Sequence, residues 1–139
     1  MRIEHELEID APVEKVWDLT LDIESWPQIT PTVDSVERLD TGPLTVGSQA
    51  QLKQPAQRKK VWTVTRLDDR RAFAWSARVL GTTMTGAHEL RAENGTTVNT
   101  LTIEVEGALA PIVGGLLRRP LLGAITRENE AFKKAAENG

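Results

Sequence analysis

The C-terminal stretch from Ala110 to Asn138 most constrains how this 139-residue chain can fold. Nothing else in the sequence is long enough for a helix of that length. Its apolar residues recur three and four positions apart, which at about 100° per residue places them on one broad face. They are Ile112, Val113, Leu117, Leu121, Ala124, Ile125, Phe132, Ala135 and Ala136. The pattern predicts an amphipathic helix that covers a hydrophobic core.

Proline and glycine weaken the first part of this predicted helix. Pro120 lacks the N–H that would bond back one turn, so we expect a kink or a restart there. Each glycine inside a helix costs about 1 kcal/mol relative to alanine. The glycines concerned are Gly114, Gly115 and Gly123. We therefore expect a looser first segment and a firm helix over residues 120–137, with Asn138 and Gly139 as its stop.

The rest of the chain alternates in the manner of β-strands. In residues 2–10, Ile3, His5, Leu7 and Ile9 share one face and charged residues share the other. A short helix should follow Asp10 and Pro12, with Asp10 as a possible cap, and a second helical turn over residues 22–26 should stop at Pro27. Six further strands are predicted over residues 33–39, 47–54, 60–67, 72–80, 84–92 and 96–107, the first of them bulged or at an edge.

This order predicts the fold class. Short turns, including the hairpin signal Asn94-Gly95, join the later strands, so the seven strands should form one antiparallel sheet. A strongly curved antiparallel sheet around one long helix is an α+β architecture. We expect residues 1–139 to form a single domain.

Composition excludes several classes of function. The net charge of −3 and the pI near 5.4 argue against nucleic acid as a partner. The chain has no cysteine and only two histidines, so we expect neither a metal site nor a cofactor. The N-terminus has no hydrophobic run, which predicts a cytoplasmic protein without stable membrane insertion. Either a monomer or a homodimer is compatible with this sequence.

Several local phrases carry a family resemblance. They are IDAPVEKVW at residues 9–17, DIESWP at 22–27, VGS at 46–48, WTVT at 62–65 and GALAP at 107–111. In this order they resemble the START-like superfamily, also grouped as SRPBCC, which includes the birch-pollen-allergen-like proteins. Within it the chain is most similar to the bacterial polyketide cyclase/dehydrase family. The resemblance implies a helix-grip fold with a cavity between the sheet and the C-terminal helix, and a lipid- or polyketide-like ligand.

Three ionisable residues are candidate catalytic groups. His5 and His88 fall on apolar strand faces, where each could exchange a proton with a ligand or be a neutral core histidine with a local partner. Glu128 falls in the middle of the helical stripe, where a carboxylate must be paired, hydrated or protonated. If Pro120 rotates the second half of the helix, Glu128 instead reaches solvent.

Apolar side chains should form the wall of the cavity. Trp62 and Trp75 lie on inward strand faces and could equally be plain core, whereas Trp26 could border an entrance. The predicted ligand-binding residues are Leu7, Trp26, Trp62, Trp75, His88, Ile103, Leu117, Leu121 and Ile125. A pocket of this kind needs mostly apolar walls and a few polar groups that orient the ligand.

Three functions remain open from the sequence. The first is binding of a small hydrophobic or amphipathic ligand. The second is a polyketide cyclase or dehydratase that uses cavity His and Glu residues, although the chain has no tyrosine and no arginine that clearly points inward. The third is a partner-binding domain, which requires an exposed apolar patch that the sequence does not indicate. Basic clusters such as Arg58-Lys59-Lys60 and Arg118-Arg119 could dock on an anionic membrane, but a solvated surface is the commoner role.

Overall fold

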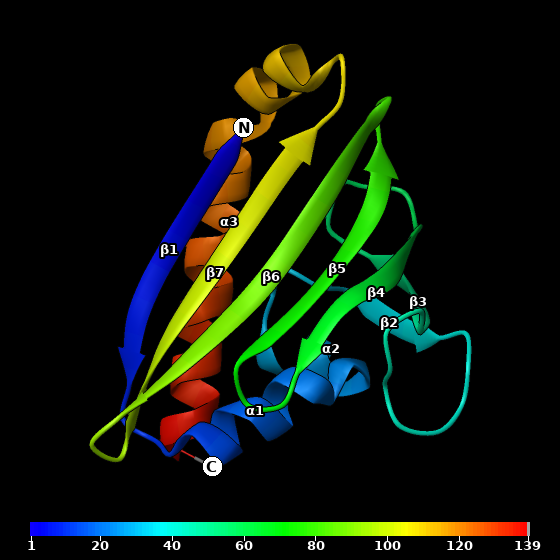
Figure 1. Cartoon of the computed structure of the whole chain (residues 1–139). Helices are drawn as coiled ribbons and strands as arrows, with labels where there is room; N and C mark the ends of the chain where they lie inside the picture. Colours follow the sequence, from blue (N-terminus) through cyan, green and yellow to red (C-terminus); the bar gives the residue numbers. More distant parts are fainter. Residues whose placement is uncertain (139) are drawn as a thin grey trace.

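A seven-stranded antiparallel sheet wraps around one long helix (Figure 1). The structure is a computed structural model that describes residues 1–138, so Gly139, part of the predicted helix stop, lies outside it. The elements are β1 (Arg2–Ile9), α1 (Val13–Leu21), the 3₁₀ turn η1 (Ile23–Ser25), α2 (Trp26–Ile29), β2 (Ser35–Arg38), β3 (Gln49–Lys53), β4 (Lys60–Asp68), β5 (Ala72–Val79), β6 (Thr82–Glu93), β7 (Thr96–Glu106) and α3 (Ala110–Asn138).

The strand order β1-β7-β6-β5-β4-β3-β2 confirms the α+β prediction. Consecutive strands from β2 to β7 are neighbours, and β1 returns to pair with β7, from Arg2 opposite Glu104 to Ile9 opposite Thr97. The strand predicted over residues 33–39 is correctly placed at an edge but is too long. It shortens to β2 because Val33 turns into the core while Leu39 is exposed. The one irregular register in the β4–β5 pair lies between Val64 and Arg66.

The two short helices differ from the sequence prediction at their starts. Pro12 takes the N-cap position of α1 and no side chain caps it. The backbone N–H of Asp10 instead donates to Glu137 Oε2 at 2.7 Å, at the far end of α3. The helical turn predicted to stop at Pro27 continues to Ile29, because proline needs no N–H in the first turn of a helix.

Helix α3 is continuous from Ala110 to Asn138, with Pro120 inside it. The looser first segment predicted from the glycines is therefore helical as well. Figure 1 shows the first turns of α3 at an angle to the remainder, which runs along β1 and β7. Pro120 explains the change of direction, because it leaves the carbonyl of Leu116 without its usual intrahelical donor.

The core lies between the concave face of the sheet and the second part of α3. Phe132 of α3 and Phe73 of β5 are fully buried, and Trp26 lies edge-on to both, with ring centroids at 5.7 and 6.2 Å. One polar pair is buried in the same layer. Asn99 of β7 donates from Nδ2 to Asn129 Oδ1 at 3.0 Å, and Asn129 Nδ2 donates back to the Asn99 carbonyl at 3.1 Å.

Candidate functional site

A groove of about 510 Å³ runs between the middle of α3 and the facing strands of the sheet. Helix α3 contributes the side chains that its apolar stripe predicts, and β4, β5 and β6 contribute the facing wall. The groove is lined by Thr32, Gln54, Ala56, Gln57, Arg58, Lys60, Trp62, Arg78, Val79, Leu80, Met84, Ile103, Leu117, Pro120, Leu121, Ala124, Ile125 and Glu128. This volume falls within the range of about 300–1,000 Å³ typical of small-molecule sites.

A smaller cavity of about 60 Å³ continues from the groove toward the core. The two spaces share five lining residues, Gln54, Trp62, Ile103, Ile125 and Glu128. Gly86 of β6 leaves part of this space open. The position that a Cβ would take on Gly86 lies 3.6 Å from Ile103 and 3.8 Å from Trp75, so a side chain there would fill the gap.

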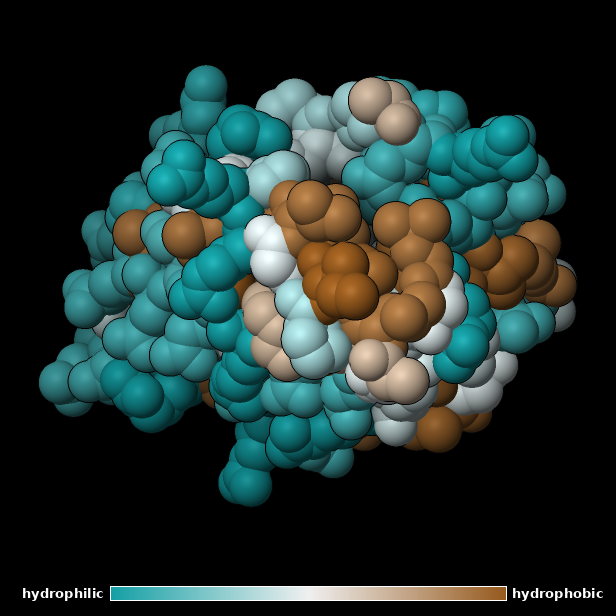
Figure 2. Space-filling model, turned by 90° about the horizontal axis from the view of Figure 1, so that it is seen from above, coloured by the Kyte–Doolittle hydropathy of each residue, from teal (hydrophilic) through white to brown (hydrophobic). Residues whose placement is uncertain are grey.

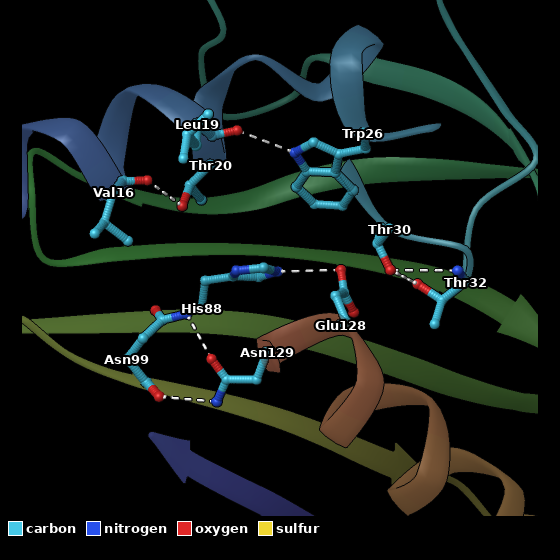
Figure 3. A network of polar contacts seen from close by, with 10 residues as sticks. All are labelled: Val16, Leu19, Thr20, Trp26, Thr30, Thr32, His88, Asn99, Glu128 and Asn129. Atoms are coloured by element: carbon cyan, nitrogen blue, oxygen red, sulfur yellow. Dashed lines mark hydrogen bonds and ion pairs between the residues drawn. The ribbon is translucent and has the colours of Figure 1, made fainter. Parts of the chain in front are cut away.

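His88 and Glu128 are the ionisable residues that line the small cavity. His88 Nε2 lies 3.6 Å from Glu128 Oε1, and their side chains are 7% and 17% exposed (Figure 3). This separation is longer than a hydrogen bond. Both atoms can therefore still bind a third polar group, such as a hydroxyl or carbonyl of a ligand.

Aromatic rings fix the imidazole of His88. It lies between Trp26 and Phe132, each with its ring centroid at 5.3 Å. His88 Nδ1 is buried and has no hydrogen-bond partner among residues 1–138, and the same holds for Trp62 Nε1. A buried polar atom without a partner is costly, so a ligand that satisfies one gains affinity.

His5 does not join this site. Asn129 Nδ2 lies 3.0 Å from His5 Nδ1 and 3.1 Å from the His5 carbonyl. Asn129 Nδ2 has two hydrogens and three acceptors within reach, these two and the Asn99 carbonyl, so it is shared among them, and His5 has a local partner in Asn129. His5 lines neither the groove nor the small cavity, so it does not share a cavity with His88. Glu128 points inward despite Pro120, as Figure 3 shows.

The other predicted ligand-binding residues fall into two groups. Trp62, Trp75, Ile103, Leu117, Leu121 and Ile125 line the groove or the cavity. Leu7 of β1 lines neither space. Trp26 lines the small cavity rather than an entrance, because it is 2% exposed and donates from Nε1 to the Leu19 carbonyl. The ligand contacts of all these residues stay a prediction.

Sequence reasoning missed the residues at the mouth of the groove. Gln54 and Arg58 line it from the β3–β4 connection and Lys60 from the start of β4, and a strand prediction carries no signal for where such a loop folds. Burial and the nearby Lys53 lower the pKa of Lys60. Arg78 also lines the mouth and donates to Thr83 Oγ1 at 3.1 Å.

Two other classes of site are absent from the part of the chain that the structure describes. Among residues 1–138, no three His, Asp or Glu side chains are arranged to hold a metal ion. None of the helices described is both long and apolar enough to span a bilayer.

Comparison with known proteins identifies the family. The family described as "Polyketide cyclase / dehydrase and lipid transport" matches residues 1–137, so this chain belongs to it. A protein of Streptomyces cyaneus with a provisional polyketide cyclase name is 38% identical over 60 residues. That alignment covers 43% of this chain and 39% of the relative, so it spans less than half of either protein.

Solved structures share the fold at low sequence identity. The Zhui aromatase/cyclase from Streptomyces sp. R1128 has a TM-score of 0.71 and 22% identity, with 99% of this chain and 92% of that chain covered. Major latex-like protein 151 from Panax ginseng has a TM-score of 0.74 at 8% identity, with 98% and 97% covered. A START superfamily protein from Mycobacterium smegmatis has a TM-score of 0.73 at 16% identity, with 99% and 97% covered. These likenesses establish the helix-grip fold.

Proposed function

We propose that this protein binds a small amphipathic ligand in the groove between α3 and the sheet. The apolar body of the ligand lies against Leu117, Leu121 and Ile125, and its polar end reaches His88 and Glu128. One observation carries the proposal: the small cavity at the inner end of an apolar groove holds a buried His88 and a half-buried Glu128 that are too far apart to hydrogen-bond to each other. Buried polar groups are normally hydrogen-bonded, so a ligand hydroxyl or carbonyl is the natural third partner.

Filling the groove tests the proposal. We expect Ala124→Phe to weaken binding of the fluorescent probe 1-anilinonaphthalene-8-sulfonate at least about tenfold, because the ring would occupy the space of the ligand. Thr126→Phe is the matched control, since Thr126 lies on the same helix but does not line the groove. Equal binding by both variants would exclude the groove as the site.

The polar end needs its own test. Glu128→Gln preserves the shape of the side chain and removes its charge. We expect it to weaken binding of decanol, measured by displacement of the probe, more than binding of decane. The reason is that only the alcohol presents a hydroxyl to Glu128. If both competitors lose affinity equally, Glu128 has no polar contact with the ligand.

The second candidate function is a polyketide cyclase or dehydratase. The specific observation is again the His88–Glu128 pair, because a carboxylate beside an imidazole can orient it as a proton acceptor for a carbon acid. The groove supplies cationic donors only at its mouth, from Arg58, Lys60 and Arg78. Turnover of a synthetic poly-β-ketone, with loss of about 100-fold or more in His88→Asn while probe binding persists, would establish the enzyme. Binding without turnover would exclude the enzyme and support the ligand-binding function alone.

A further inference from the structure

One end of the molecule exposes an apolar cluster that the fold does not bury. Leu80 in the β5–β6 turn is 70% exposed, and Leu109, Ile112 and Leu116 near the start of α3 are 47%, 64% and 74% exposed. We call these four residues the apolar tip. The position of a Cβ on Gly81 lies 3.0 Å from Leu109 Cδ1, so the turn and the start of α3 touch. Figure 2, which views this end, shows the apolar surface gathered at its centre.

The spacing within α3 explains why the apolar tip stays exposed. Leu109, Ile112 and Leu116 are three and four residues apart and form a second stripe on the first part of the helix. The adjoining stripe, which includes Val113 and Leu117 about 100° further around the helix, already faces the core and the groove. This part of the chain is therefore apolar on two sides, and only one of them is buried. The sequence predicted Ile112 on the stripe that covers the core, and this was wrong, because Ile112 lies on the exposed side of the helix.

The charges around the apolar tip are mainly basic. Three segments supply the mouth of the groove and the tip, residues 54–60, 78–84 and 107–127. They contain seven of the 17 Lys and Arg residues of the chain and none of its 20 Asp and Glu residues, leaving ten basic against 20 acidic elsewhere. The acidic residues next to these segments are Glu106, opposite Thr83, and Glu128, which lines the groove. The basic residues are Arg58, Lys59, Lys60, Arg78, Arg118, Arg119 and Arg127. An acidic protein thus has one strongly basic end.

The chemistry of this end favours a lipid surface over other partners. A second copy of the chain would bring two basic ends together, which like-charge repulsion opposes. Protein interfaces are enriched in aromatic residues, whereas the tip is made of leucine and isoleucine alone. Aliphatic side chains beside Lys and Arg are what an interfacial helix presents to anionic lipid.

We propose that the apolar tip and its basic surroundings dock this protein reversibly on anionic lipid bilayers. Leu80, Ile112 and Leu116 enter the interfacial layer, and Arg118 and Arg119 contact the headgroups. The groove opens beside the tip, because Leu80 and Leu117 line it. Docking itself does not depend on what the groove holds. Transfer of an apolar ligand between bilayer and groove rests on the proposed function.

Vesicle flotation with the full-length protein tests the docking. We expect binding to phosphatidylcholine vesicles that contain about 30 mol % phosphatidylserine, and little binding to phosphatidylcholine alone. Binding should fall strongly between about 0.05 M and 0.5 M salt, because screening weakens the attraction of the basic residues. Vesicle binding that needs neither the anionic lipid nor low salt would overturn the proposal.

Paired variants separate the apolar and basic contributions. Arg118→Glu with Arg119→Glu should weaken vesicle binding at least about 25-fold, since each Lys or Arg near an anionic surface contributes about a factor of five. The matched control is Arg66→Glu with Arg91→Glu, which changes net charge equally on a different surface. Ile112→Gln with Leu116→Gln should weaken binding at least about tenfold, and Val46→Gln, 62% exposed in the β2–β3 loop, should not.

Each other outcome contradicts the proposal. If the control pair of arginines weakens binding as much as Arg118 and Arg119 do, net charge rather than this end is responsible. If Leu116→Gln instead abolishes a dimer seen by analytical ultracentrifugation, the tip binds a second copy. If the apolar substitutions leave vesicle binding unchanged, no side chain enters the bilayer. Probe binding in the groove, measured in parallel without vesicles, shows separately whether the proposed function fails.

Discussion

The two parts of α3, before and after Pro120, differ in what they contact. After Pro120, Ile125, Asn129 and Phe132 are buried against β1, β7 and α2, and Glu137 binds the backbone ahead of α1. Before Pro120, Ile112 and Leu116 are largely exposed, and two adjacent glycines interrupt the side chains. One helix therefore has one part that holds the fold and another that is available for partners. Substitutions along α3 can separate these two roles.

The largest effect on stability should come from Phe132. This ring is fully buried and contacts Trp26 and His88, so Phe132→Ala should cost about 3–5 kcal/mol of unfolding free energy. Urea denaturation followed by tryptophan fluorescence measures it. Phe132→Leu keeps most of the volume and should cost clearly less. A loss below about 1 kcal/mol in the alanine variant would mean that the second part of α3 does not hold the fold.

The next effect should come from the buried amide pair. Asn129→Ala leaves Asn99 Nδ2 without its acceptor, and we expect a loss of about 1–3 kcal/mol. Asn99→Ala should cost a similar amount. The double variant should lose less than the sum, because the second substitution removes a group already left unpaired. Strict additivity in a denaturation cycle would show that the two amides do not interact.

Glu137 should give a smaller and pH-dependent effect. Hydrogen bonds from Lys133 and from the Asp10 backbone N–H hold the pKa of Glu137 below its usual value. A carboxylate with a lowered pKa in the folded state stabilises the protein above its unfolded-state pKa, and this contribution disappears as pH falls through the folded-state pKa. Glu137→Gln should therefore lower the melting temperature at neutral pH and make no difference in strong acid. A difference that persists in acid would assign the effect to packing.

The smallest effect should come from Leu116. It is 74% exposed, so Leu116→Gln should change the unfolding free energy by no more than about 0.5 kcal/mol. Val113→Gln, three residues earlier on the buried side, should destabilise markedly, because it places an amide in the core. A large loss in Leu116→Gln would show that the apolar tip contributes to folding rather than to docking.

Periodicity made most of the fold predictable. Strands β5, β6 and β7 follow from inward residues such as Trp75, His88 and Ile103, which repeat at strand spacing. The stripe of α3 follows from apolar residues that repeat at helix spacing. Their inward direction follows from the same spacing. For this reason His88 and Glu128 could be singled out before their contact at 3.6 Å was known.

The parts that could not be predicted depend on contacts between distant segments. Asn129 shares the stripe of Ile125 and Phe132, and Asn99 shares the inward face of Leu101, so a signal existed for each. Their pairing across 30 residues leaves no local trace. The depth of Trp26 and the exposure of Ile112 have the same origin, because burial depends on how α2 and the first part of α3 dock on the sheet.

The pairing of β1 with β7 has a consequence for how the chain folds. Arg2 lies opposite Glu104, 102 residues later, so β1 can pair only after β7 has been synthesised. Hairpins from β3 to β7 can form locally, but the edge that receives β1 exists only after β7, which ends at Glu106, has left the ribosome. Folding rates fall as contacts become less local, so closure of this pair should be a late event in synthesis. Until then Ile3 and Ile9 remain exposed, and the alternating glutamates of β1 keep this waiting strand from pairing with other chains.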